Sequence, residues 1–169
     1  MLHRIANAFV VLALLTLPST LAGQGNASAL TAENRQGSID QTRAVLEGYW
    51  KNHDPKYVAE DAVFTMMPSG EVINGRAAIA KHLEGFYHGA LDAKAEVVNG
   101  VFGEGEGVLE ALVVGRHTGT FAGIAATGRE VRVPLSVAYE LENGLIKKAR
   151  IYLMVNVLVA QIGEAKPSR

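Results

Sequence analysis

The dipeptide Asn143-Gly144 constrains the fold more than any other feature of this sequence. It lies between two apolar runs, residues 130–142 and 145–155. Asn and Gly adopt the positive φ angles of a two-residue hairpin turn, so the pattern predicts two antiparallel strands joined by a tight turn. Residues 108–115 form a third, mostly apolar run before a glycine-containing loop. We therefore expect three consecutive antiparallel strands over residues 108–155.

The region before these strands carries two helical patterns. Apolar residues at helical spacing predict one helix over residues 38–53, with Ser38 as its N-cap, and a second over residues 75–88. Shorter apolar or alternating segments predict strands over residues 62–67 and 92–102. Helices followed by a series of antiparallel strands indicate an α+β fold, in which the helices pack on one face of a bent sheet.

The N-terminal segment has the features of a secretory signal peptide. Residues 1–22 begin with a short basic stretch, continue with an apolar run, and end in small residues suited to cleavage. The apolar run is shorter than the roughly 20 residues of a membrane span, although an uncleaved anchor is the alternative. We expect residues 23–37 to be a flexible leader, residues 38–163 to be the domain and residues 164–169 to be a tail. The mature protein would then be exported, periplasmic or secreted, and not held in the membrane.

Composition narrows the choice of partners. The 169 residues suffice for one domain, and the net charge is −1. Basic residues form no run or basic-aromatic stripe, so a nucleic-acid partner is not expected. The histidines and acids show no tight ligand spacing, and no glycine-rich loop precedes a helix. We therefore expect neither a metal nor another cofactor.

Several short segments together resemble a known family. They are His117-Thr-Gly-Thr-Phe121-Ala-Gly123, Thr127-Gly128-Arg129, Asn143-Gly144, Arg150-Ile-Tyr152 and Gln161-Ile-Gly163. This pattern is similar to that of the SnoaL-like polyketide cyclase (ester cyclase) family. Its cone-shaped α+β fold is shared with nuclear transport factor 2, ketosteroid isomerase and scytalone dehydratase. The resemblance implies a strongly bent antiparallel sheet that wraps around N-terminal helices and encloses a pocket, and a homodimer formed through the outer sheet face. It does not specify the reaction, because this fold hosts many activities.

The last strand supplies two candidate catalytic residues. By alternation, Arg150 and Tyr152 share a face with Met154. If that face is turned inward, Arg150 and Tyr152 would bind or polarise a substrate oxygen. The alternative is that Arg150 pairs with a carboxylate, such as Glu110 or Glu140, in a structural ion pair.

The third catalytic candidate is His117, which matches a recurring histidine of the family. Alternation places it on the face of Val113, where it could act as a general acid or base. Alternatively, its ring holds the shape of the glycine-containing loop. His53 and His88 lie at helix ends, and the pattern assigns neither of them to a site. The side chains that we expect to line the pocket are Tyr49, His82, Met66, Phe86, Val113, Val137 and Met154.

Met154 leaves two hypotheses for the function. In the family, an acidic residue that acts as general acid/base commonly stands four residues after the arginine that matches Arg150. Here that position is Met154, and a thioether cannot transfer protons. One hypothesis is an exported enzyme that acts on a small apolar carbonyl compound by proton transfer, as an isomerase, lyase or aldol-type cyclase, with its base elsewhere. The other is a non-catalytic protein of the same fold that binds a small apolar molecule. A third hypothesis is a pure interaction module.

Overall fold

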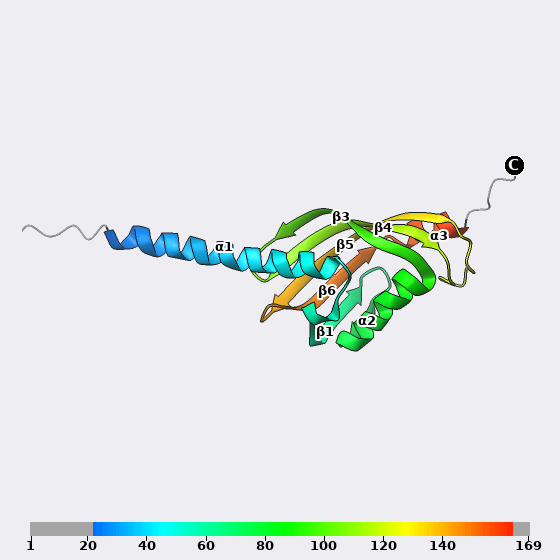
Figure 1. The fold of residues 1–169 in the computed structure, drawn as a ribbon, viewed down its shortest axis with the longest axis horizontal. Coiled ribbons are helices and arrows are strands. Elements are labelled where there is room, and N and C mark those ends of the chain that lie inside the picture. Colours follow the sequence, from blue (N-terminus) through cyan, green and yellow to red (C-terminus); the bar gives the residue numbers. More distant parts are fainter. Residues whose placement is uncertain (1–21, 164–169) are drawn as a thin grey trace, which may run out of the picture. The chain divides into compact units, whose positions relative to one another are not determined.

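The computed structural model describes the backbone of residues 22–163 and the side chains of residues 31–163 (Figure 1). The predicted signal peptide, except for Ala22, and the predicted tail lie outside the described residues. The compact unit discussed below begins at Asn34. The elements in chain order are α1(Ala22–Trp50), η1(Pro55–Tyr57), β1(Val58–Met66), β2(Glu71–Asn74), α2(Arg76–Glu84), η2(Gly85–Ala90), β3(Leu91–Phe102), β4(Glu106–His117), β5(Glu130–Glu142), β6(Leu145–Leu153) and α3(Val155–Gly163).

Six strands form one curled, open sheet in the order β2-β1-β6-β5-β4-β3 (Figure 1). Strands β3 to β6 pair with their neighbours in antiparallel fashion, as expected for consecutive hairpins. The α+β prediction is confirmed, with one correction. The β1–β6 pair is parallel, because the chain returns to the middle of the sheet only after it has built β3, β4 and β5. The short strand β2, which pairs with β1, was not predicted.

The Asn143-Gly144 turn joins β5 to β6, as predicted. Both residues have positive φ angles, 52° and 74°. This is the backbone geometry of a type I′ hairpin turn, whose twist matches that of the flanking strands. The turn sets the pairing of Leu141 with Ile146, and a one-residue register shift between Glu140 and Leu141 then pairs Val137 with Ile151. The turn and this shift together decide which side chains of β6 face the core.

Helix α1 begins at Ala22, whereas the sequence predicts a start at Ser38. The segment 23–37, expected to be a flexible leader, is helical in the structure. Extending an existing helix costs little, because each added residue gains a backbone hydrogen bond. The buried stripe lies in the last part of the helix and comprises Thr42, Leu46, Tyr49 and Trp50. The Thr42 hydroxyl accepts a hydrogen bond from the Gly105 amide at 3.0 Å, which ties the helix to the β3–β4 turn.

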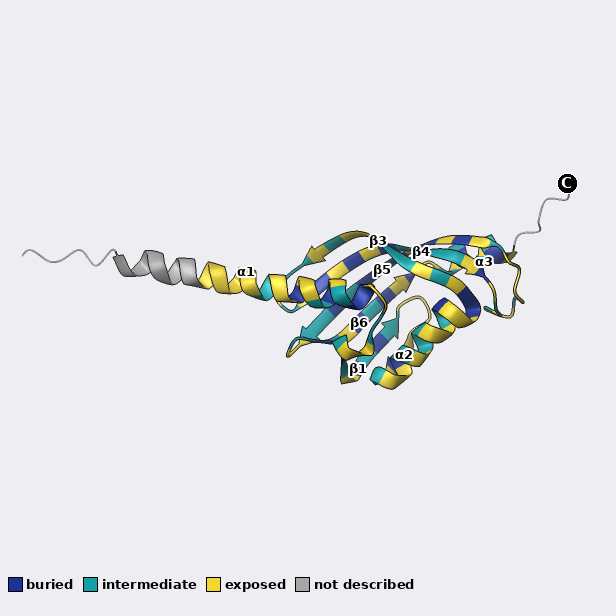
Figure 2. Ribbon diagram, viewed as in Figure 1, coloured by how far each residue is buried: buried dark blue, intermediate teal, exposed yellow. Residues whose placement is uncertain are grey.

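The helices and the concave face of the sheet enclose one hydrophobic core. Along β4 and β5, buried side chains alternate with exposed or half-buried ones (Figure 2), as expected for a sheet with one face in the core. The fully buried apolar members include Leu46, Tyr49, Val58, Ala62, Phe64, Ile79, Leu91, Leu109, Val113, Val133, Ile146, Ala149, Leu158 and Ile162. The described residues 22–163 contain no helix long and apolar enough to cross a membrane.

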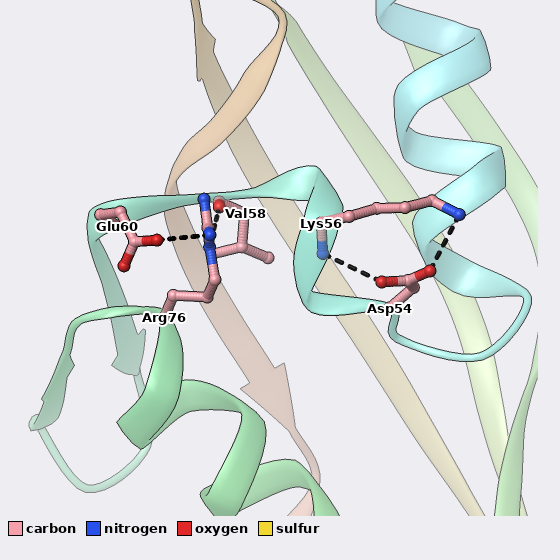
Figure 3. Close-up of polar contacts among 5 residues, drawn as sticks. All are labelled: Asp54, Lys56, Val58, Glu60 and Arg76. Atoms are coloured by element: carbon pink, nitrogen blue, oxygen red, sulfur yellow. Dashed lines mark hydrogen bonds and ion pairs between the residues drawn. The ribbon is translucent and has the colours of Figure 1, made fainter.

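Arg76 anchors the start of α2 to β1. Its Nε donates a 2.6 Å hydrogen bond to the Val58 carbonyl oxygen, and its guanidinium pairs with Glu60 (Figure 3). The helix is shorter than the predicted 75–88 segment. It ends at Glu84 and continues as one π-helical turn, η2. This turn places Tyr87 in the core, beside the end of α1.

Candidate functional site

An aromatic cavity lies between the end of α1, the α2–η2 segment and the concave face of the sheet. Its volume is about 50 Å³, which exceeds the roughly 10–15 Å³ that one water molecule requires. The cavity can therefore hold a small group of ligand atoms. Its walls are formed by Tyr49, Trp50, His53, Phe64, Met66, His82, Leu83, Phe86, Tyr87, Leu135, Val137, Tyr139, Ile151 and Leu153. The polar groups of these side chains are phenol hydroxyls, an indole N–H and imidazoles, and none is a carboxylate.

Tyr49 lines this cavity and has a buried hydroxyl without a partner. The residue is 1% exposed, and its hydroxyl has no hydrogen-bond partner. Burial raises the pKa of Tyr49 well above its usual value, and the nearby Tyr87 raises it further. The phenol is therefore fully protonated at neutral pH. A buried O–H without an acceptor is energetically costly, so Tyr49 would gain from any ligand oxygen that enters the cavity.

The hydroxyl of Tyr139, on β5, already has a partner. It accepts a hydrogen bond from the Trp50 indole Nε1 at 2.8 Å. Burial is the largest cause that raises the pKa of Tyr139, so this phenol is also neutral. The rings of Tyr49 and Tyr139 meet edge to face with their centroids 6.2 Å apart. This contact and the hydrogen bond hold α1 against β5 and fix the position of the Tyr49 ring.

His53 enters the cavity from the turn after α1. Its φ angle is 52°, a left-handed conformation that glycine or asparagine adopts more readily and that costs other residues about 1–2 kcal/mol. Its amide donates a 2.7 Å hydrogen bond to the Tyr49 carbonyl oxygen. The imidazole stacks on Tyr87 at 5.0 Å and meets Tyr49 edge-on at 5.2 Å. Burial, and secondarily His88, lowers the pKa of His53 to about 4, so this ring is neutral at pH 7.

The turn that carries His53 is fixed on its other side by the next residue. The Asp54 carboxylate accepts a 3.0 Å hydrogen bond from the Lys56 amide and pairs with the Lys56 ammonium (Figure 3). This caps the short helix η1 at its N-terminus. The sequence His53-Asp54-Pro55 therefore ends one helix and starts the next within three residues. The signal that could have identified His53 is a histidine at a helix C-terminus, where glycine is the common residue.

A wider groove adjoins the cavity. It has a volume of about 820 Å³, and its walls include polar side chains such as Lys81 and Glu71. Four residues line both spaces: Met66, His82, Phe86 and Leu153. A ligand larger than the cavity can therefore place one end among the aromatic rings and the rest in the groove.

Five of the residues that the sequence assigns to the pocket line this cavity. They are Tyr49, Met66, His82, Phe86 and Val137. Val113 does not: it lies on the inward face of β4 but is fully buried in the core. The lining residues that sequence reasoning missed are mostly aromatic: Trp50, His53, Phe64, Tyr87 and Tyr139. They come from four separate elements and from a turn, so no local pattern groups them.

The orientation of β6 corrects the expectation for Arg150, Tyr152 and Met154. The inward face of this strand carries Ile151 and Leu153, which line the cavity. Tyr152 is 46% exposed and Met154 is 45% exposed. The apolar face of the strand is buried because placing the arginine in the core would require its desolvation.

Arg150 forms the structural ion pair that was the alternative interpretation. Its guanidinium contacts the Glu140 carboxylate on the neighbouring strand, and Lys148 lies 3.1 Å from the same carboxylate. The hydrogen bond from Arg150, followed by that from Lys148, holds the pKa of Glu140 below its usual value. The pair stabilises the outer face of the β5–β6 hairpin and is not part of the cavity.

His117 is fully buried at the end of β4 and lines none of the cavities described above. Its Nδ1 accepts a hydrogen bond from the Thr127 amide at 3.3 Å and lies 3.0 Å from the Thr127 hydroxyl. Because Nδ1 accepts, Nε2 carries the proton, and this buried N–H has no partner. The backbone of His117 also bonds to Gly128 and Arg129. The geometry matches the alternative in which this ring holds the shape of the 118–129 loop.

Two further segments of the sequence pattern serve the fold. The Gln161 side chain on α3 accepts a 2.9 Å hydrogen bond from the Arg132 amide and donates one of 3.0 Å to the Arg132 carbonyl oxygen. Arg129 donates to the Gln161 carbonyl oxygen at 2.9 Å. These bonds attach α3 to β5. The described part of the chain has no cluster of three or more histidines and acids that could hold a metal ion.

Comparison with known families agrees with this architecture. The model of the SnoaL-like polyketide cyclase family matches residues 39–162. The chain belongs to this family. No curated protein matches the sequence significantly.

Solved structures of the same fold are distant in sequence. A candidate SnoaL-like polyketide cyclase from Jannaschia sp. CCS1 superposes with a TM-score of 0.69 at 14% identity, over 76% of this chain and 95% of the other. A candidate polyketide cyclase from Xanthomonas campestris pv. campestris gives 0.67 at 18% identity, over 74% and 98%. A phenazine biosynthesis-related protein from Pseudomonas aeruginosa gives 0.64 at 16% identity, over 81% and 94%. These likenesses establish the cone-shaped fold and leave the reaction open.

Proposed function

We propose that this chain is an enzyme that acts on a small apolar carbonyl compound by proton transfer, as an isomerase, a lyase or an aldol-type cyclase. The observation that carries the proposal is the Tyr49 hydroxyl, which is buried without a partner in an apolar cavity whose other polar members include imidazoles. Membership of the SnoaL-like family supports the same class of chemistry.

The Tyr49 hydroxyl would stabilise the intermediate of such a reaction. Removing a proton next to a carbonyl places negative charge on the carbonyl oxygen, and a preorganised donor in a water-poor site stabilises that charge strongly. The apolar walls keep the local dielectric low, which strengthens the interaction. A proton acceptor is also needed. The imidazoles of His53 and His82 supply this function, because the lining of the cavity has no carboxylate.

The proposal is tested by proton exchange on a small ketone. Cyclohexanone is incubated with the protein in D2O, and loss of its α-proton signal is followed by NMR. We expect exchange above the buffer rate, and a loss of about 10²–10³-fold in Tyr49→Phe, as for removal of one oxyanion donor. Tyr152→Phe, which removes an exposed hydroxyl, is the matched control and should exchange at the unaltered rate. Equal exchange in Tyr49→Phe and the unaltered protein would refute the role of Tyr49.

A second candidate is a non-catalytic protein that binds a small apolar molecule. The observation that favours it is the lack of any carboxylate among the cavity-lining residues, because this chemistry commonly uses one as its base. A phenol such as 4-nitrophenol resembles the enolate and tests binding alone. Binding that is lost in Tyr49→Phe, without exchange on any small ketone offered, would favour this second function.

We also propose that the chain forms a homodimer through the outer sheet face. Apolar side chains are exposed there on three strands or strand ends, namely Val101, Val108, Tyr152 and Met154, and Val101 pairs directly with Val108. Light scattering should give twice the chain mass. Val108→Lys should give a monomer, whereas Val72→Lys, at the far edge strand β2, should remain a dimer. A monomeric unaltered protein would reject this proposal.

Export is the remaining proposal, and it rests on the sequence of residues 1–22 alone. If that segment is a cleaved signal, the protein recovered from the producing cell should begin at or just after Ala22. Intact mass measurement of the protein from the periplasm or medium, compared with that from the cytoplasm, tests this. An intact N-terminus in the exported fraction would favour an uncleaved anchor instead.

A further inference from the structure

We propose that His53 is the base of this site and that it exchanges its proton with solvent through a second, outward-facing pocket. This rests on the proposed proton-transfer function and assigns a role to a residue that neither the sequence pattern nor the family assigns. The outward pocket has a volume of about 180 Å³. Its walls are formed by Asn52, His53, Pro55, Ala80, Leu83, Glu84, Tyr87 and His88.

The position of His53 between two spaces is the first argument. His53, Leu83 and Tyr87 line both the aromatic cavity and the outward pocket. Of these three side chains, the neutral imidazole is the one that carries both a proton-accepting and a proton-donating ring nitrogen. An imidazole has two nitrogens on opposite sides of its ring, so one can take a proton from a ligand while the other releases a proton to solvent.

The second argument is how firmly the ring is held. His53 has a positive φ angle, and non-glycine residues in such conformations cluster at functional sites. Tyr49 and Tyr87 contact two sides of the imidazole. Asp54 caps the helix that follows (Figure 3). These contacts hold the imidazole beside the Tyr49 phenol, with the two ring centroids 5.2 Å apart.

The third argument is the charge around the ring. The titratable groups that line the cavity and the outward pocket with it are Tyr49, Tyr87, Tyr139, His82, Glu84 and His88. The tyrosines near the ring are neutral because burial raises their pKa values. Glu84 and His88 are exposed. The ring itself is neutral at pH 7, which leaves a nitrogen lone pair free to accept a proton.

The proposed step moves a proton from a ligand carbon to His53. A lone pair of the neutral His53 ring takes the proton from the carbon next to the carbonyl. The C–H electron pair becomes a C=C bond, and the carbonyl π pair moves to the oxygen, which accepts a hydrogen bond from the Tyr49 hydroxyl. The second ring nitrogen of His53 then loses its proton to water or to His88 in the outward pocket, and the abstracted proton stays on the first nitrogen of the neutral ring. The ring turns about its Cβ–Cγ bond so that this nitrogen meets the outward pocket, where its proton exchanges with solvent, and a solvent-derived proton is then returned from the ring to the ligand carbon.

His82 is the other imidazole that could act as the base, and its position differs from that of His53. It lies on α2 and lines the cavity together with the open groove, at the side from which a ligand would enter. A ligand whose carbonyl oxygen accepts a hydrogen bond from Tyr49 needs its base next to that phenol. His53, whose ring contacts Tyr49, meets this requirement.

The test compares three variants with the unaltered protein in the cyclohexanone exchange assay. The variants are His53→Asn, His82→Asn and His88→Asn. Asparagine tolerates positive φ angles and is a poor base, so His53→Asn keeps the turn and removes the proton acceptor. Binding of 4-nitrophenol, followed by its visible absorbance, reports whether the Tyr49 side of each variant is intact.

We expect exchange to fall by about 10²–10⁴-fold in His53→Asn, the usual loss for a general base, while 4-nitrophenol still binds. We expect His88→Asn to slow exchange in dilute buffer and to regain the rate when imidazole is added. Exchange that is lost in His82→Asn and kept in His53→Asn would overturn the assignment. A slow His88→Asn variant that imidazole does not restore would overturn the route through the outward pocket.

A second measurement, the pH dependence of kcat/KM, needs only the unaltered protein. With His53 as the base, kcat/KM should rise with pH through a pKa near 4 and stay level through neutral pH. A rise centred near 6.5, the ordinary histidine value, would overturn the assignment. Failure of the unaltered protein to exchange any ketone proton would instead reject the proposed function itself. Exchange that depends on Tyr49 and not on His53 would reject only this inference.

Discussion

The Trp50 indole Nε1 lies 2.8 Å from the Tyr139 hydroxyl oxygen, and both groups are buried. This hydrogen bond joins the last residue of α1 to β5 beside the aromatic cavity. It also gives Tyr139 a partner, whereas the neighbouring Tyr49 hydroxyl has none. The Tyr139 hydroxyl therefore helps to hold the cavity together, and the Tyr49 hydroxyl is available to a ligand.

Tyr139→Phe should lower the free energy of unfolding. The change leaves the buried Trp50 N–H without an acceptor, which costs about 1–3 kcal/mol. Urea unfolding measures this directly, with Tyr152→Phe as the control because its hydroxyl is exposed and should change stability by less than about 0.5 kcal/mol. Equal stabilities for the two variants would show that the Trp50–Tyr139 bond contributes nothing.

His53 should make the protein less stable in mild acid. Its pKa is about 4 in the folded chain and about 6.5 when unfolded, so between these values the unfolded chain binds the extra proton. Stability is therefore full above about pH 6.5 and falls as the pH drops towards 4, by at most about 3 kcal/mol.

The measurement is the free energy of unfolding in urea at pH 7 and at pH 4.5. His53→Asn should show a smaller difference between the two pH values than the unaltered protein, because asparagine does not titrate. His88→Asn, an exposed histidine nearby, is the matched control. The same acid sensitivity in His53→Asn and the unaltered chain would contradict the half-buried, neutral state of this ring.

Thr127→Val should affect stability and not chemistry. It removes the hydroxyl that lies 3.0 Å from His117 Nδ1 and should cost about 1 kcal/mol, the net value of one neutral hydrogen bond. The rate of cyclohexanone exchange by the folded variant should not change, because neither residue lines the aromatic cavity. A large loss of exchange at unchanged stability would instead restore His117 as a catalytic group.

The Glu140–Arg150 pair should contribute little, although its pH dependence has a defined sign. The pKa of Glu140 is lowered in the folded chain, so its contribution is present above the unfolded carboxyl pKa and is lost as the pH falls through the folded value. About a third of the Glu140 side chain is exposed, and such pairs contribute under about 1 kcal/mol. Glu140→Gln should therefore reduce stability at pH 7 slightly and at pH 2 not at all, as measured by urea unfolding.

The sequence was informative where local chemistry decides the structure. Asn143-Gly144 predicted its turn because few residues accept two positive φ angles. Alternation along β4 and β5 placed Val113, Val137 and His117 on the inward face, where the structure has them. Alternation cannot say which face is inward without weighing burial costs, and on β6 it predicts an inward polar face, whereas the apolar face is buried.

The cavity was harder to predict, because its walls come together only in three dimensions. Tyr49 and Tyr139 are separated by the whole β1–β4 region, and their contact depends on how α1 crosses the sheet. The sequence does not single out His53, because a histidine beside Asp-Pro resembles an ordinary helix end. Its place at a helix C-terminus, where glycine is the common residue, is the one local signal of its positive φ angle.

The most direct test of the account is the initial rate of deuterium incorporation into cyclohexanone, measured at a series of ketone concentrations with the unaltered protein and with Tyr49→Phe. The account predicts saturable exchange by the unaltered protein and a kcat lower by about 10²–10³-fold in the variant. Exchange no faster than in buffer, or a rate that is the same in both proteins, would contradict a proton-transfer site built around the Tyr49 hydroxyl.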